Sequence, residues 1–90
     1  MQLARVVGTA TGTAKDPSLS GHKLLVVDLV DAHGEVGQPH QIVVDAVGAG
    51  LVDLVLVATG SAARQTASTR SAATDATAVA IIDEVTVGSN

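Results

Sequence analysis

The chain of 90 residues contains no Phe, Tyr or Trp, so its core has to be built from aliphatic side chains alone. Aromatic side chains each bury about 150–250 Å² and dominate most protein cores and interfaces. A short chain without them has less apolar area to bury per residue, although 47% of its residues are hydrophobic. We therefore expect one small domain over residues 1–90 whose copies associate with one another.

Aliphatic residues alternate with other residues in several segments that are bounded by Gly, Pro, Asp or Ser. This period of two favours strands over helices. The pattern predicts strands at Gln2–Thr11, Lys23–Asp31, Gln41–Val47, Leu54–Ala58 and Ala78–Val87. An all-β domain with short connections follows from it.

The segments between these strands have the composition of turns. Lys15–Gly21 contains Pro17 and Gly21, Asp31–Pro39 is polar throughout, and Gly48–Gly50 is short and small. Residues 59–78 shift to Ala, Ser and Thr, and Ser61 is placed to cap a short helix that ends near Gln65. We expect an ordered crossover with this helix before the last strand.

Both faces of the strand predicted at Lys23–Asp31 are mostly apolar. One face carries Leu25, Val27 and Leu29, and the other carries Leu24, Val26 and Val30. A strand of an isolated barrel usually has one polar face exposed to solvent. Two apolar faces therefore indicate that the outer face is covered as well. The cover is either another element of the same chain or a neighbouring subunit, and the pattern leaves both possibilities open.

Composition excludes several classes of function. Nine acidic residues against five Lys and Arg give a net charge of −4, and no aromatic residue can stack on a base, so a nucleic-acid partner is not expected. The absence of Cys excludes disulfides, thiolate metal sites and a cysteine nucleophile. The sequence shows neither a secretory signal nor a membrane span, which predicts a soluble cytosolic protein.

No group of residues has the pattern of a catalytic, cofactor or metal site. Gly48-Ala49-Gly50 precedes a predicted strand, whereas a phosphate loop precedes a helix, and Ser61 lacks a Gly-x-Ser-x-Gly context. The remaining candidates are His22, His33 and His40 for a metal and Asp28, Asp31 and Glu35 for acid and base catalysis. All lie in or beside predicted loops without partners at suitable spacing, so we expect no enzyme, cofactor or metal.

Three segments together resemble the EutN/CcmL family, the pentameric vertex proteins of bacterial microcompartment shells, including carboxysomes. They are Lys15–Val27, Val44–Val57, and Gly60–Thr66 followed by Asp75-Ala76 and Ile81-Ile82-Asp83. The chain departs from the family at three positions. Val52 and Ala80 stand where glycine is frequent and Ala73 where proline is common, which puts the local backbone geometry there in doubt.

The resemblance implies a small five-stranded OB-like barrel that forms a homopentamer and caps the five-fold vertices of a shell. Its partners would be copies of itself and hexameric or pseudo-hexameric shell proteins, in a microcompartment of the bacterial cytoplasm, with no nucleic acid or membrane. The segment implied near the five-fold axis contains Gly60, Ser61, Ala62 and Arg64. The implied subunit interface contains Lys15, Asp16, Pro17, Leu19, Val47, Gly48 and Ala49.

An alternative from another class stays open. A β-barrel adaptor could hold a peptide or a cargo enzyme along an exposed strand edge. It would share the fold and differ in being a monomer with an unpaired edge.

Overall fold

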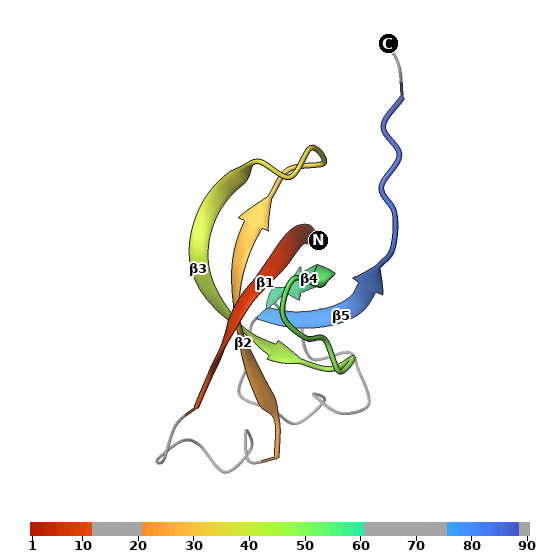
Figure 1. The fold of residues 1–90 in the computed structure, drawn as a ribbon. Coiled ribbons are helices and arrows are strands. Elements are labelled where there is room, and N and C mark those ends of the chain that lie inside the picture. The colour runs from red at the N-terminus through yellow and green to blue at the C-terminus, as the bar shows by residue number, and fades with distance from the viewer. Residues whose placement is uncertain (12–20, 61–75, 89–90) are drawn as a thin grey trace.

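The computed structural model describes residues 1–11, 21–60 and 76–88, and these form an all-β barrel (Figure 1). Its strands are β1 (Gln2–Ala10), β2 (Lys23–Val30), β3 (Val36–Asp45), β4 (Leu54–Thr59) and β5 (Ala76–Ile82). They close in the order β1-β2-β3-β5-β4, which confirms the predicted five-stranded barrel. The helix predicted between Ser61 and Gln65 lies outside the described residues.

The barrel closes unevenly. Four of the neighbouring strand pairs are antiparallel, and β3 and β5 are parallel. This parallel pairing consists of Val44 beside Thr77 and Asp45 beside Ala78 only, whereas β2 and β3 pair along most of their length. Parallel pairing requires a long connection, and the chain between β3 and β5 includes the whole of β4.

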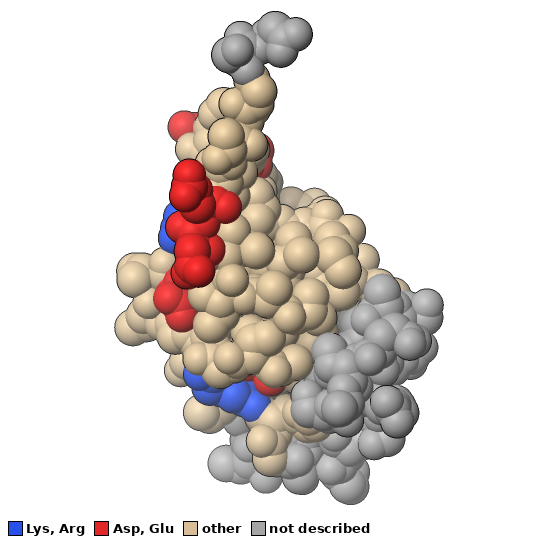
Figure 2. Space-filling model, turned by 90° about the vertical axis from the view of Figure 1, so that its right-hand side faces the viewer, with Lys and Arg blue, Asp and Glu red and all other residues tan. Residues whose placement is uncertain are grey.

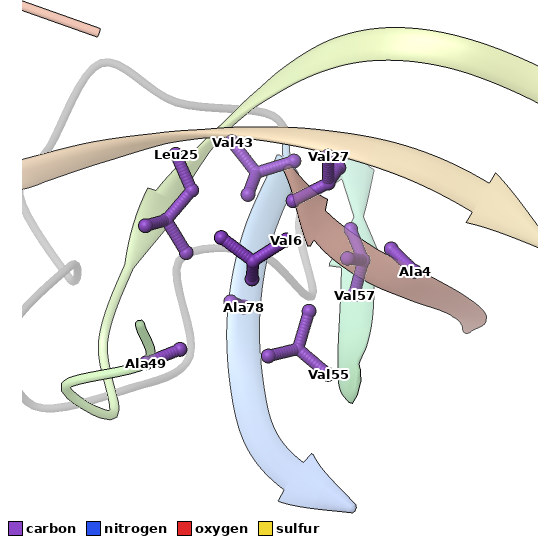
Figure 3. Close-up of a cluster of buried hydrophobic side chains, with 9 residues drawn as sticks. All are labelled: Ala4, Val6, Leu25, Val27, Val43, Ala49, Val55, Val57 and Ala78. Carbon is purple, nitrogen blue, oxygen red and sulfur yellow. The ribbon is translucent and has the colours of Figure 1, made fainter. Parts of the chain in front are cut away.

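The core contains side chains from every strand and from the connection between β3 and β4 (Figure 3). Its members are Ala4, Val6, Leu25, Val27, Val43, Ala49, Val55, Val57 and Ala78. All are aliphatic, as the composition requires, and each is at most 3% exposed. Fully burying a Val or Leu side chain contributes about 1.5–3 kcal/mol, so a well-packed set of this kind stabilises the barrel without aromatics.

The second apolar face of β2 is only partly covered. Leu25 and Val27 are fully buried, while Leu24 and Val26 on the opposite face are half-buried. Ile42, which pairs with Val26 across β2 and β3, is 52% exposed. The part of the chain that the structure describes therefore leaves apolar surface on the outside of this sheet.

Two of the predicted strand boundaries are wrong by several residues. β3 begins at Val36 and not at Gln41, because the polar segment after Gly34 turns back and pairs with β2. β5 covers Ala76–Ile82, whereas the prediction was Ala78–Val87. Its partner β4 begins at Leu54, opposite Ile82, so no backbone continues the ladder beyond that pair.

Other boundaries shift by one or two residues. β1 and β2 each end one residue before the prediction, and β3 ends at Asp45 because the carboxylate of that residue starts a turn. Among the described residues, no helix is long and apolar enough to cross a bilayer.

Candidate functional site

The connection between β3 and β4, residues 46–53, contains the described part of the predicted interface. Asp45 organises its start, since its Oδ1 accepts hydrogen bonds from the backbone N–H groups of Val47 at 3.0 Å and Gly48 at 3.1 Å. Its Oδ2 lies 3.3 Å from Nζ of Lys23, and that ammonium group also donates to the carbonyl of Ala49. The turn is thus held to β2 by one carboxylate and one lysine.

The burial of Asp45 makes this network important for folding. Its side chain is 2% exposed, and a buried carboxylate is costly unless charged and polar partners surround it. Asp45 was not among the predicted site residues. The signal was available, because an Asp shortly before a glycine often bonds the backbone two or three residues on.

The three predicted interface residues in this connection differ in accessibility. Gly48 is exposed with a φ of 76°, a conformation that glycine adopts without steric cost. Val47 is half-buried and packs against the core. Ala49 is fully buried in the core, so only its backbone could contact another copy.

The second half of the connection has its own carboxylate. Asp53 accepts the N–H of Gly50 at 2.8 Å through Oδ2, and the backbone of Val52 exchanges bonds with Val6 and Arg5 of β1. Because these amide groups already bond carboxylates and carbonyls, and a strand follows at Leu54, the glycine pair is not a phosphate loop. Gly48-Ala49-Gly50 thus lie in a connection between two strands, where the sequence predicted a short turn.

Of the residues implied near the five-fold axis, the structure describes Gly60. It follows the end of β4, is exposed, and has a φ of 63°. Ser61, Ala62 and Arg64 lie outside the described residues. So do Lys15, Asp16, Pro17 and Leu19 of the predicted interface.

Gly60 borders a hollow of about 300 Å³ at one end of the barrel. Gln2, Gln38, Gln41 and Thr59 contribute its polar side chains. Amides and hydroxyls donate and accept hydrogen bonds, but they do not titrate near neutral pH. The hollow can therefore bind polar groups or water, and its lining contains no acid, base or nucleophile activated by a neighbour.

Two of the three acidic residues that were considered for catalysis, Asp28 and Asp31, accept hydrogen bonds from the backbone. Asp31 Oδ1 accepts the N–H groups of His33 at 2.8 Å and Glu35 at 3.0 Å in the turn between β2 and β3. These bonds, first that from Glu35, hold the pKa of Asp31 below its ordinary value. Asp28 accepts the N–H of His40 at 2.9 Å. A general acid at neutral pH needs a raised pKa, so Asp31 is unsuited to that role.

Figure 2 shows acidic atoms in a strip that runs down one edge beneath the C-terminal extension. Asp31, Asp83 and Glu84 line a hollow of about 270 Å³ together with Arg5 and His33. The described residues contain no cluster of three His, Cys, Asp or Glu placed to hold a metal. An acidic surface of this kind repels a phosphate backbone.

Comparisons with known proteins agree with this geometry. The family described as ethanolamine utilisation protein EutN/carboxysome matches residues 1–83. The carboxysome shell vertex protein CcmL of Synechocystis sp. is 47% identical over 99% of this chain and 89% of its own length. The microcompartment shell vertex protein PduN of Salmonella typhimurium is 46% identical over 92% of this chain and 96% of its own.

A solved structure shares the barrel. The pentameric microcompartment shell protein GrpN from Rhodospirillum rubrum superposes with a TM-score of 0.88 at 43% identity. The match covers 98% of this chain and all of that one. The likeness therefore extends over the whole domain.

Proposed function

The chain belongs to the EutN/CcmL family, and from this membership we propose that it is a homopentamer that caps the five-fold vertices of a bacterial microcompartment shell. It is a structural protein and not an enzyme, because its relatives are shell vertex proteins. The observation that carries the proposal is the match to pentameric GrpN over 98% of this chain and all of that one. Relatives named for both carboxysomes and other microcompartments match with similar identity, so the proposal covers the vertex role in general.

The physical role follows from geometry. A shell of flat hexagonal tiles cannot close without five-fold units, and a head-to-tail ring of identical barrels supplies such a unit. We propose that the partners at the rim are hexameric and pseudo-hexameric shell proteins, and that the complex lies in the bacterial cytoplasm within the shell.

Particular residues are proposed for particular places in the ring. Gly60 and the following Ser61, Ala62 and Arg64 face the five-fold axis, where small residues allow close approach of the copies. The residues proposed to face the neighbouring subunit are Lys15, Asp16, Pro17, Leu19, Val47, Gly48 and Ala49. What supports the second assignment is the fixed geometry of the 46–49 turn, because the Asp45–Lys23 network presents Gly48 at the surface.

Native mass spectrometry at micromolar concentration tests the assembly directly. We expect a single species of about five times the 8.9 kDa chain mass. A monomer would overturn the proposal and favour the adaptor hypothesis. Co-expression with a hexameric shell protein then tests the role: closed polyhedra should form with this chain and open sheets or tubes without it, as seen by electron microscopy.

A further inference from the structure

Polar side chains occupy inward-facing positions at one end of the barrel. Directly opposed residues on neighbouring strands place their side chains on the same face of the sheet. Gln2 lies opposite Val57, which is a member of the core. Gln41 lies opposite Val27, which also belongs to the core. Both glutamine positions therefore face the interior of the barrel.

Two more polar residues face inward at the same end. Gln38 lies opposite Leu29, and Thr59 lies opposite a small residue, Ala76. Both of these partners pack against the core. Nearer the middle of the barrel the inward-facing positions are aliphatic, so polar residues interrupt the expected pattern here. Such interruptions in a fold that is otherwise consistent with its sequence are typical of functional sites.

A bulge in β3 brings two of the glutamines to one face. Residues three apart in a regular strand, such as Gln38 and Gln41, would lie on opposite faces. In this stretch β3 has one residue more than β2, because Pro39 and His40 lie across from the single residue Asp28. The extra residue reverses the alternation, and both glutamines face inward.

The bulge is held in a conformation that a residue other than glycine seldom adopts. The φ of His40 is 57°, in the left-handed region. Its N–H donates to Oδ1 of Asp28 at 2.9 Å, and this bond fixes the backbone there. Bulges redirect side chains beside functional sites, and strained backbone conformations cluster at such sites. The backbone of β3 thus points to the same end of the barrel as the inward-facing polar side chains.

The hollow of about 300 Å³ beside Gly60 lies at this mouth of the barrel, and all five strands contribute to it. Its lining includes two buried core residues, Val43 and Val57. The volume is at the lower end of the range for small-molecule sites, which often lie in the mouths of β-barrels. A glutamine amide and a threonine hydroxyl each donate and accept hydrogen bonds. The described residues of the lining have no ionisable side chain, so they offer hydrogen bonds and apolar contact to a ligand.

We propose that this mouth of the barrel binds a small uncharged molecule with hydroxyl, carbonyl or amide groups on a short carbon chain. The carbon chain contacts the valine side chains, and the polar groups bond the glutamine amides and the Thr59 hydroxyl. A charged molecule would lose hydration there without gaining an opposite charge from the described lining, and this is costly. The proposal goes beyond the vertex role and does not depend on the pentamer, because one chain forms the mouth.

Nuclear magnetic resonance of the isotopically labelled protein tests the site, because each glutamine side chain gives its own amide signals. The protein is titrated with two neutral probes, glycerol and propionamide. With at least one of them we expect saturable shifts of the side-chain amide signals of Gln2, Gln38 and Gln41, half-complete on the order of 10 mM. Glycerate and serinol match glycerol in size but carry a negative and a positive charge at neutral pH. Both should bind about tenfold more weakly than the neutral probe, or worse.

Two threonines at different ends of the barrel give a matched pair of variants. Thr59→Val removes a hydroxyl from the lining and should raise the half-saturating concentration of the probe about threefold or more. Thr9 is exposed on β1 opposite Leu25 and does not line the hollow, so Thr9→Val should leave that concentration unchanged. Gln38→Glu places a carboxylate in the mouth and should reverse the preference, so that serinol binds more tightly than glycerol.

The absence of a saturable shift with both neutral probes overturns the proposal. Equal binding of the charged analogues, equal effects of the two threonine variants, or a Gln38→Glu variant that still prefers glycerol each contradict it as well. Glutamine signals that change when the assembly dissociates, and not with a probe, assign these amides to a contact between copies and also overturn it. None of these outcomes bears on the vertex role, which native mass spectrometry tests separately.

Discussion

Val52 is held in a backbone conformation that suits it poorly, and replacing it by glycine should stabilise the protein. Its φ is 63°, in the left-handed region where a β-branched side chain is strained. The position is fixed from both sides, since the Val52 N–H donates to the Val6 carbonyl at 2.9 Å and its own carbonyl accepts from Arg5 Nη1 at 2.8 Å. The substitution Val52→Gly keeps both bonds. It also restores the glycine that is frequent at this position of the family.

The size of the effect follows from three contributions. Relief of left-handed strain at a β-branched residue contributes about 2 kcal/mol. The greater freedom of glycine in the unfolded chain opposes this by about 0.7 kcal/mol. Val52 is 74% exposed, so the burial that is lost is a quarter of a Val side chain, or about 0.4 kcal/mol. The net expectation is a stabilisation of about 1 kcal/mol.

Leu51→Gly is the matched control, because Leu51 is the adjacent exposed residue and does not have a positive φ. It should destabilise by about 1 kcal/mol through chain entropy and lost burial. Val52→Asn, which keeps a Cβ but tolerates the left-handed region, should also stabilise. Thermal unfolding at matched chain concentration is the assay, since assembly makes the midpoint concentration-dependent. For a domain of this size 1 kcal/mol corresponds to roughly 4–8 °C. If Val52→Gly and Leu51→Gly lower the midpoint equally, the strain argument is refuted.

Three further predictions concern the buried network, the acidic turn and the axis. Asp45→Ala should lower the free energy of unfolding in urea by about 2–3 kcal/mol, because it removes the acceptor for the N–H groups of Val47 and Gly48. Asp45→Asn can keep that acceptor and should cost about half as much. Equal losses in the two variants would contradict the role of Oδ1. Because the pKa of Asp31 is lowered in the folded state, its ionised side chain stabilises the fold above the ordinary value of 3.8, and this stabilisation is lost as the pH falls through the lower folded-state value. The difference in unfolding free energy between wild type and Asp31→Ala should therefore be constant near neutral pH and shrink below pH 3.8. A difference that grows in acid would be the wrong sign. Ser61→Arg should alter the packing around the proposed five-fold axis or the mass of the assembly, while the circular dichroism of the barrel stays unchanged. An unaltered ring in a crystal structure would reject the proposed axial position.

The sequence was sufficient for the strands that contribute most to the core. β2 and β4 were predicted to within one residue, because both are short runs of Leu and Val bounded by residues typical of turns. The aliphatic core was also predictable, since no other apolar side chains were available. The strand bounds and the composition of the core both depend on which residue types a short segment contains, and this can be read without knowing what the segment contacts.

The turn network and the first half of β3 could not be predicted in the same way. Residues 36–42 are exposed on both faces and include Gly37 and Pro39, so their composition is that of a loop. They form a strand because β2 presents a backbone to pair with. The contact between Lys23 and Asp45 joins residues far apart in the chain, and only the register of β2 and β3 makes them neighbours.

The end of the chain shows the opposite error, and the two errors have one cause. Val85 and Val87 continue the alternation of β5, so the sequence predicts a strand there, yet β4 offers no backbone beyond Leu54. Alternation reports which side chains avoid water, whereas a strand also needs a neighbouring edge. β3 has an edge without the expected side-chain pattern, and the C-terminal segment has the pattern without an edge.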